Sequence, residues 1–239
     1  MKLTIQSNTP LNAAVYRMCL RGELPPHRPG QFVQVAVPGF YLRRPISVFD
    51  AEGDSLTLVY RVTGEGTARL AQCAAGETLS VLSGLGNGYD LEKAGEKPLL
   101  VGGGIGLPPL YLLCRRLKDA GRFPVVAAGF SGAGDVILRQ DFEALGVPFH
   151  VATLDGSCGK KGLVTALLPE LDFDSLCACG PVPMMQALWR ETAVPAQFSL
   201  EERMGCGFGA CMGCTLITTA GPKRVCKEGP VFGREELKW

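Results

Sequence analysis

The chain has 239 residues, of which 46% are hydrophobic and 20% are charged, and its formal net charge is +1. This length allows one large or two small domains, and so balanced a charge excludes the basic surface that nucleic-acid binding requires. The opening MKLTIQSNTPLNAAVYRM lacks a cationic stretch followed by an apolar one, so no signal peptide is expected. The uncharged run 98–114 is too short and too interrupted by glycine and proline to cross a membrane. We therefore expect a cytoplasmic protein without nucleic-acid or membrane partners.

Residues 1–97 contain short β-rich runs separated by turn signals such as PPHRPG and EGD. This spacing predicts a small antiparallel barrel or sandwich. The runs are KLTIQS, VYRMCL, QFVQVAV, PISVFD, SLTLVYRV and ETLSVL.

Residues 98–195 change to a repeated order of apolar strand, turn and helical stretch. The four units are LLVGG with PPLYLLCRRLKDAG, PVVAAGF with LRQDFEAL, PFHVAT with GLVTALLPEL, and SLCACG with PMMQALWRE. Such alternation predicts a parallel sheet covered by helices. Pro108 and Pro109 mark the start of the first helix, and Gly121 marks its end.

Residues 196–239 form a tail rich in glycine and cysteine. Ten cysteines in a reducing compartment argue for metal or redox use of those that cluster. Four of them follow the spacing C-x4-C-x2-C-x11-C, whose first intervals match the plant-type run that holds a [2Fe–2S] cluster. A structural zinc site is the alternative, but zinc sites usually pair two C-x2-C knuckles and this tail has one. The predicted ligands are Cys206, Cys211, Cys214 and Cys226.

Two segments of the β-rich region can bind anions. In YLRRPISVFD, Arg44 precedes a proline that keeps it extended, so that it can pair with a diphosphate while Ser47 faces a ring system. In YRVTGEGTARLAQ, Gly64, Gly66 and Thr67 stand at the start of a short helix, where free N–H groups attract phosphate. Together they indicate a diphosphate ligand in the barrel.

The turn VGGGIGLPP resembles a dinucleotide-binding loop but departs from G-x-G-x-x-G. Gly104 and Gly106 are present, whereas Pro109 takes the third position, and a simple tight turn between strand and helix stays the alternative. No acidic residue ends the second strand, so the spacing does not decide between NAD and NADP. The carboxyl edge of the same sheet should also carry Cys179, Gly180 and Pro181, with Asp155, Gly156 and Ser157 in a nearby loop.

The whole chain resembles the ferredoxin–NADP reductase superfamily in carrying R-P-x-S in a barrel, a glycine loop and C-G-P. Within it, SLEERMGCGFGACMGC followed by RVCKEGPVF resembles the electron-transfer subunits of class B dihydroorotate dehydrogenase. The resemblance implies a fold of three parts: a flavin-binding barrel at 1–97, a nucleotide-binding α/β domain at 98–195 and a cluster region at 196–239.

The resemblance also implies the cofactors and the residues that bind them. FAD would contact the barrel, NAD would approach the parallel sheet, and the cysteines would hold the cluster. The implied FAD residues are Arg44, Pro45, Ile46, Ser47, Tyr60, Arg61, Val62, Gly64, Gly66 and Thr67. The implied NAD residues are Gly102, Gly103, Gly104, Gly106, Cys179, Gly180 and Pro181.

The implied function is electron transfer without substrate carbon chemistry in this chain. Electrons would come from the FMN of a catalytic subunit, in a heterotetramer with two copies of each subunit, and would leave to NAD⁺ in pyrimidine synthesis. No catalytic acid or base is expected, because His27 lies in a turn and His150 in a predicted buried strand. Two alternatives are a reductase subunit of a hydrogenase or of a ferredoxin-linked transhydrogenase, and a zinc-stabilised nucleotide-binding module without redox activity.

Overall fold

Six strands at the N-terminal end close into an antiparallel barrel in the order β1-β2-β5-β4-β3-β6. The computed structural model describes all residues, 1–239. Each of the six predicted runs forms a strand, and the barrel prediction is confirmed. A short helix, α1 (Glu65–Ala71), follows β5. The strands are β1 (Lys2–Pro10), β2 (Val15–Arg21), β3 (Phe32–Val35), β4 (Arg44–Glu52), β5 (Ser55–Arg61) and β6 (Thr78–Leu85).

Strand alternation fills the inside of the barrel with branched apolar side chains. Val33 and Val35 of β3 point inward and join the barrel core, whereas Phe32 joins the core of the second sheet. The outer face of β3 is therefore also covered by protein, because the rest of the chain packs on it. This placement makes β3 a boundary between two parts of the molecule.

A seven-stranded sheet forms the second layer, in the order β10-β9-β8-β7-β11-β12-β15. All neighbours are parallel except the last pair, in which β15 runs antiparallel to β12. The predicted parallel sheet is confirmed. The strands are β7 (Pro98–Gly103), β8 (Val125–Phe130), β9 (Phe149–Thr153), β10 (Lys160–Lys161), β11 (Ser175–Cys179), β12 (Ala196–Ser199) and β15 (Val231–Gly233).

Three α-helices connect the strands of this sheet, and the predicted bounds of the first are confirmed. Pro108 caps α2 and Gly121, with a φ of +75°, follows its end. The α-helices are α2 (Pro109–Asp119), α3 (Arg139–Ala144) and α4 (Val182–Glu191). Short 3-10 helices complete the set: η1 (Glu92–Ala94), η2 (Gly104–Gly106), η3 (Ala133–Asp135), η4 (Val164–Glu170) and η5 (Arg234–Glu236).

Two details of the sheet differ from the sequence analysis. The stretch predicted as the third helix folds as the 3-10 helix η4, which contains Pro169, a residue that cannot donate an α-helical hydrogen bond. In addition, β12 and β15 come from the C-terminal 44 residues and complete the sheet edge. The remaining hairpin of that segment consists of β13 (Thr215–Thr218) and β14 (Gly221–Arg224). No helix combines the length and the apolar character that crossing a bilayer would need.

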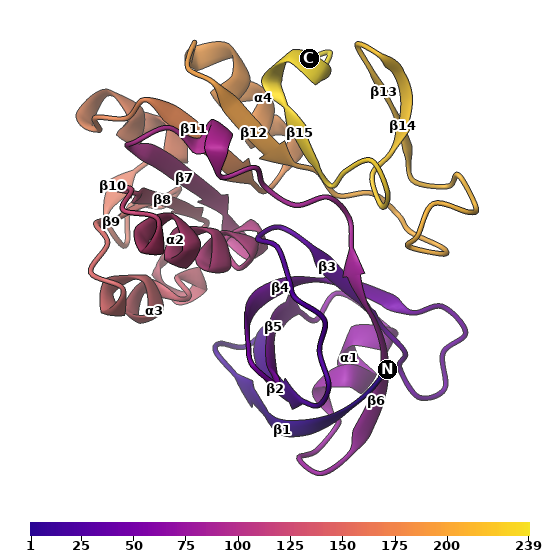
Figure 1. Ribbon diagram of the computed structural model, residues 1–239. Helices are drawn as coiled ribbons and strands as arrows, with labels where there is room; N and C mark the ends of the chain where they lie inside the picture. The colour runs from indigo at the N-terminus through magenta and orange to yellow at the C-terminus, as the bar shows by residue number, and fades with distance from the viewer.

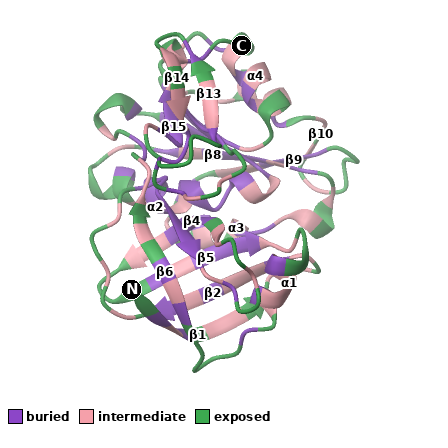
Figure 2. Ribbon diagram, turned by 90° about the vertical axis from the view of Figure 1, so that its right-hand side faces the viewer, coloured by how far each residue is buried: buried purple, intermediate pink, exposed green.

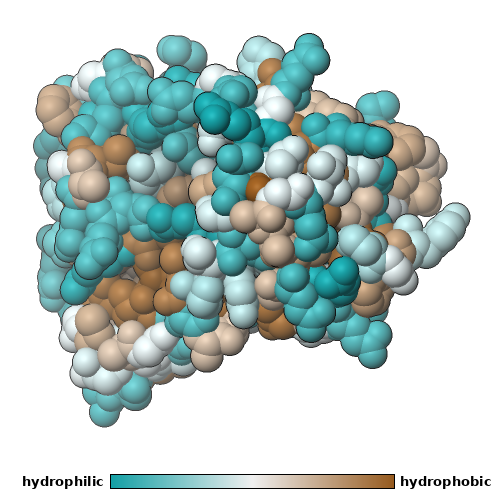
Figure 3. Space-filling view, turned by 90° about the horizontal axis from the view of Figure 1, so that it is seen from below, coloured by the Kyte–Doolittle hydropathy of each residue, from teal (hydrophilic) through white to brown (hydrophobic).

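Barrel and sheet pack against each other along helix α2, and the hairpin β13–β14 stands beside the sheet (Figure 1). The rings of Phe49 and Tyr111 stack with centroids 4.3 Å apart across this contact. Arg115 of α2 reaches the barrel and pairs with Asp50 at 2.6 Å. Figure 2 shows buried residues along the strands of both layers and exposed residues in the peripheral loops. From below, the molecule is largely polar around one apolar hollow (Figure 3).

Candidate functional site

The four predicted cluster cysteines lie in the C-terminal segment as two pairs. The N–H groups of Ala210 and Cys211 donate to Sγ of Cys206 at 3.2 and 3.4 Å. The N–H group of Cys226 donates to Sγ of Cys214 at 3.4 Å. A hydrogen bond thus joins the members of each pair, one within the loop and one between the loop and the end of the hairpin.

This paired arrangement bears on the two metal sites that the sequence allows, a [2Fe–2S] cluster and a structural zinc site. A zinc ion would need four thiolates that converge on a single point. In a [2Fe–2S] cluster, by contrast, the four cysteines divide between two irons. The pairing of Cys206 with Cys211 and of Cys214 with Cys226 matches that division of ligands.

The two pairs also differ in electrostatics. Desolvation raises the pKa of Cys206, but the N–H groups of Cys211, Phe208 and Ala210 outweigh it and lower that pKa to about 6. Desolvation and the adjacent Cys214 raise the pKa of Cys226 to about 12. Thiolates are the metal-binding form, so the backbone of the loop prepares Cys206 as a ligand at neutral pH.

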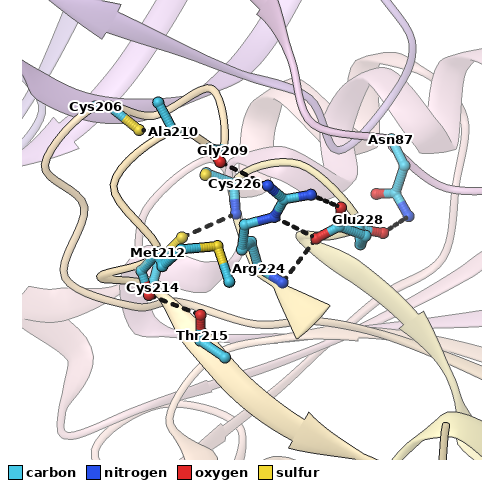
Figure 4. A network of polar contacts seen from close by, with 10 residues as sticks. All are labelled: Asn87, Cys206, Gly209, Ala210, Met212, Cys214, Thr215, Arg224, Cys226 and Glu228. Atoms are coloured by element: carbon cyan, nitrogen blue, oxygen red, sulfur yellow. Dashed lines mark hydrogen bonds and ion pairs between the residues drawn. The ribbon is translucent and has the colours of Figure 1, made fainter. Parts of the chain in front are cut away.

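Arg224 connects the loop to the hairpin (Figure 4). Its Nη1 donates to the carbonyl oxygen of Gly209 at 2.6 Å, and its Nε donates to Oε2 of Glu228 at 2.9 Å. The side chain of Asn87, from the connection between β6 and β7, donates to the carbonyl oxygen of Glu228 at 2.9 Å. The hydrogen bond from Arg224 is the main cause that lowers the pKa of Glu228 to about 2. This network fixes the cluster loop to the body of the protein.

The two anion-binding segments of the barrel meet in space. A Cβ built on Gly66 would lie 2.2 Å from Nε of Arg44, so the guanidinium covers the start of α1. The hydroxyl of Thr67 accepts from the N–H groups of Thr63 and Gly64 at 2.9 and 3.2 Å, which holds this turn closed. A guanidinium and a helix start on one spot make a site for a diphosphate.

The other predicted flavin residues lie on β4 and β5, and Val62 directly follows β5. Pro45 is exposed, Ser47 is partly exposed and Ile46 is buried inside the barrel, as strand alternation requires. Tyr60 is also buried, and its hydroxyl donates to Oδ1 of Asn8 at 2.9 Å. The Tyr60 ring therefore faces the barrel core, and its contribution to a ligand site can come only from its backbone.

A cavity of about 610 Å³ opens at the carboxyl edge of the parallel strands. It brings together six of the predicted residues, and one of them, Arg61, comes from the barrel. Ligands of parallel sheets bind at this edge, and the volume suits a nucleotide. The predicted residues that line it are Arg61, Gly103, Gly104, Gly106, Gly180 and Pro181.

Two predicted nucleotide residues, Gly102 and Cys179, do not line the cavity. A Cβ on Gly102 would lie 2.6 Å from Cδ1 of Leu107, so this glycine allows the turn between η2 and α2 to pack on the strand. Cys179 is 2% exposed, and burial raises its pKa to about 12. A Cβ on Gly106 would lie 2.3 Å from the carbonyl oxygen of Cys179, which places the glycine loop directly on the end of β11.

The structure adds a residue to the cavity that the sequence analysis does not single out, Glu201. Glu201 is exposed at the rim of the cavity, yet desolvation of its carboxyl raises its pKa. The only feature of the sequence that points to Glu201 is the acidic pair Glu201–Glu202, which precedes the first cluster cysteine. Nearby, the N–H and hydroxyl groups of Ser157 donate to Oδ1 of Asp155 at 2.9 and 2.6 Å, so this loop is held by its own contacts.

Neither histidine lies in the cavity. Nε2 of His27 lies 2.5 Å from the hydroxyl of Ser83, and desolvation lowers the pKa of this histidine. His150 is a partly buried residue of β9. The cavity thus offers two carboxyl groups, from Asp135 and Glu201, a guanidinium, hydroxyl groups and backbone groups, but no imidazole.

A barrel with a diphosphate site, joined to a parallel sheet with a nucleotide cavity, defines a flavin- and nucleotide-binding oxidoreductase of the ferredoxin–NADP reductase fold. The solved structure of the ferredoxin NADP+ reductase from Neisseria gonorrhoeae with bound FAD and NADP has this fold, with a TM-score of 0.65. The two are 17% identical, and the match covers 80% of this chain and 89% of that one.

Closer relatives identify the family. Residues 201–238 match the family model of the iron-sulfur cluster binding domain of dihydroorotate dehydrogenase B. The "Dihydroorotate dehydrogenase B (NAD(+)), electron transfer subunit" of Shouchella clausii is 45% identical, over 97% of this chain and 95% of its own. The chain belongs to this family of electron transfer subunits, as the sequence analysis predicts. A chain from the NADH-dependent reduced ferredoxin-NADP oxidoreductase structure is 30% identical, with a TM-score of 0.88 over 99% of this chain and 90% of that chain.

Proposed function

We propose that this chain is the electron-transfer subunit of a dihydroorotate dehydrogenase B. It carries electrons from the FMN of a partner catalytic subunit, by way of a [2Fe–2S] cluster and FAD, to NAD⁺ in de novo UMP synthesis. The observation that carries this function is the 45% identity over 97% of the chain to an electron transfer subunit of that name. The similarity to a ferredoxin-NADP oxidoreductase, at 30% identity, is lower.

The barrel residues provide the flavin site in this proposal. FAD supplies the exchange between hydride and single electrons that joins a pyridine nucleotide to an iron–sulfur cluster. The guanidinium of Arg44 and the N–H groups at the start of α1, around Gly66 and Thr67, hold the diphosphate. Segments 44–47 and 60–62 with Gly64 complete the wall of the site. Arg61 belongs to both this wall and the nucleotide cavity, so it is positioned between the two ligands.

The cavity at the sheet edge receives the nicotinamide nucleotide. Gly103, Gly104, Gly106 and Gly180 present backbone without side chains, and the ring of Pro181 completes this part of the lining. Gly102 and Cys179 lie behind the cavity lining, where they pack against the glycine loop. The domain bounds 1–97, 98–195 and 196–239 are part of this proposal, with β12 and β15 as the contribution of the third segment to the sheet.

The cluster loop is the proposed docking face for the catalytic subunit, in a heterotetramer with two copies of each chain. Cys206, Cys211, Cys214 and Cys226 hold the cluster. Phe208 and Met212 are 56% and 53% exposed on the same loop. Met212 has a φ of +61°, a conformation that is rare for a residue with a side chain. It lies in the cluster loop, directly after Cys211. None of the ten cysteines forms a disulfide, which suits a cytoplasmic complex.

Replacement of one cluster ligand tests the function. Cys214→Ser should remove or cripple the cluster and abolish dihydroorotate-dependent NAD⁺ reduction when the variant is mixed with the catalytic subunit. NADH oxidation by an artificial acceptor should remain within about twofold, because Arg44, Arg61 and the cavity are untouched. Cys158→Ser, which changes a thiol outside the loop, is the matched control and should keep both activities. If Cys214→Ser retains full dihydroorotate-dependent NAD⁺ reduction, the proposed electron route is wrong.

A further inference from the structure

Gln34 is a buried amide without a partner. It lies in β3 and is 0% exposed, yet neither Nε2 nor Oε1 of its side chain has a hydrogen-bond partner in the protein. Buried polar groups that form no hydrogen bond are unfavourable and rare, so each one calls for an explanation. An amide kept in such a place indicates a partner that is not part of the polypeptide.

Other buried glutamines in the chain show what a satisfied amide looks like. Nε2 of Gln31 donates to the carbonyl oxygen of Gly86 at 2.8 Å, and its Oε1 accepts from the N–H group of Arg28 at 3.0 Å. Gln197 exchanges two hydrogen bonds of 2.8 Å with the backbone of Asp90. Gln34 differs from both, although it is the least exposed of the three.

The side chain of Gln34 points out of the barrel and against the cluster loop. Its neighbours Val33 and Val35 point inward, so alternation turns Gln34 to the outer face. A Cβ built on Gly207 would lie 2.4 Å from Nε2 of Gln34 and 2.7 Å from its Cγ. Gly207 has a φ of +79° and directly follows Cys206, so the amide nitrogen lies beside the residue next to the first cluster ligand.

The same face of the barrel carries the proposed flavin segment. Gln34 pairs with Pro45 across β3 and β4, and Phe32 pairs with Ser47. The other neighbour of Gln34, across β6, is Leu82. No other side chain of β3 brings a polar group to the space between segment 44–47 and the loop that starts at Cys206. Gln34 is therefore a polar side chain that contacts both the strand of the flavin segment and the cluster loop.

We propose that the carboxamide of Gln34 donates a hydrogen bond to a sulfur of the cluster on its Cys206 side. This rests on the proposed function, because it requires the cluster. Gln34 is a positioning residue: it holds the loop at a fixed place on the barrel and stabilises negative charge on sulfur. Reduction adds negative charge, so this donor favours the reduced cluster and raises its reduction potential.

Two substitutions of Gln34 test the proposal. Gln34→Met keeps the length of the side chain and removes the donor, and Gln34→Glu replaces the donor with a carboxylate of the same shape. Both should lower the midpoint of the cluster in an EPR-monitored redox titration of the purified subunit, Glu more than Met. The expected change is at least tenfold in the one-electron equilibrium constant, about 59 mV. Gln34→Met should not lower the stability of the metal-free chain, since it breaks no protein hydrogen bond.

Gln197→Met is the matched control. It breaks the three hydrogen bonds of another buried glutamine, two with Asp90 and one with Sγ of Cys177, so it should lower stability and leave the midpoint unchanged. The proposal is wrong if both Gln34 variants bind the cluster and keep its wild-type midpoint. It is also wrong if only the flavin midpoint shifts, or if Gln197→Met shifts the cluster midpoint by the same amount. A wild-type subunit that shows no cluster signal contradicts the proposed function itself.

Discussion

The guanidinium of Arg44 lies directly over Gly66, where a Cβ would stand 2.2 Å from Nε and 2.3 Å from Nη2. Two segments that are 22 residues apart thus form one site. A side chain at position 66 cannot coexist with this position of Arg44, since real Cβ atoms do not approach other atoms so closely. The site therefore depends on the absence of a side chain at 66 as much as on the charge at 44.

Gly66→Ala should displace Arg44 and weaken flavin binding at least tenfold. The helix itself should not suffer, because alanine is the better helix former. The ratio of FAD to protein after gel filtration, read from the flavin absorbance, measures the effect. Gly134→Ala is the matched control, since nothing lies within 4 Å of a Cβ there and the residue lies outside the flavin site. Equal FAD content in both variants would contradict the diphosphate site.

Gly106→Ala should damage the nucleotide cavity. Its Cβ would lie 2.3 Å from the backbone oxygen of Cys179, and backbone cannot move aside as a flexible side chain can. We expect a KM for NADH raised more than tenfold and a loss of stability of about 1–3 kcal/mol. Steady-state kinetics with an artificial acceptor and thermal unfolding measure both. Gly134→Ala, where a Cβ meets nothing within 4 Å, should leave both values unchanged.

The strands and the first helix could be predicted because their residues carry the signal locally. Alternating apolar residues mark the barrel strands, and Pro108 with Gly121 marks α2. The strands β12 and β15 are only four and three residues long, and their stability comes from pairing with each other and with β11. Such short segments carry no periodic pattern of their own, so only the assembled sheet defines them.

The site was predictable where it depends on residue type and spacing, as in the cysteine loop and the glycine turns. It was not predictable where two distant segments meet. Strand alternation turns Gln34 outward, and nothing in FVQV shows that the outer face is also buried. Glu201 enters the cavity only because β12 extends the sheet beside β11. These contacts are set by tertiary packing, for which a single sequence gives no direct signal.

Arg224→Met should loosen the cluster loop. It removes the bond to the carbonyl oxygen of Gly209 at 2.6 Å and the ion pair with Glu228. We expect cluster bleaching in the presence of a chelator to be at least fivefold faster, followed by absorbance in the visible range. Lys223→Met removes a charge from the same strand that forms no ion pair, and it should bleach like the wild type. Equal acceleration in both variants would mean that net charge, rather than attachment of the loop, controls cluster loss.

Asp174→Asn should weaken, at neutral pH, the contact between the segments that lead into β7 and β11. Oδ2 of Asp174 accepts from the N–H groups of Glu96 and Lys97 at 2.8 and 3.0 Å. Desolvation raises the pKa of Asp174, but these N–H groups together with Ser175 outweigh it, so the pKa lies below its ordinary value. A lowered carboxyl pKa contributes stability above the pKa of the unfolded chain, about 3.9, and this contribution is lost as the pH falls through the folded value.

The side chain is exposed, so screening by solvent limits the expected loss to about 1 kcal/mol at pH 7. The difference from the wild type should shrink as the pH falls below about 4, because protonation then removes the same charge from the native residue. Urea unfolding of the metal-free chain at pH 7, 5 and 3 measures this. Asp172→Asn breaks only a surface pair with Lys97 and should cost less than about 0.5 kcal/mol at every pH. If the loss in Asp174→Asn is independent of pH, the carboxylate charge does not contribute to this contact.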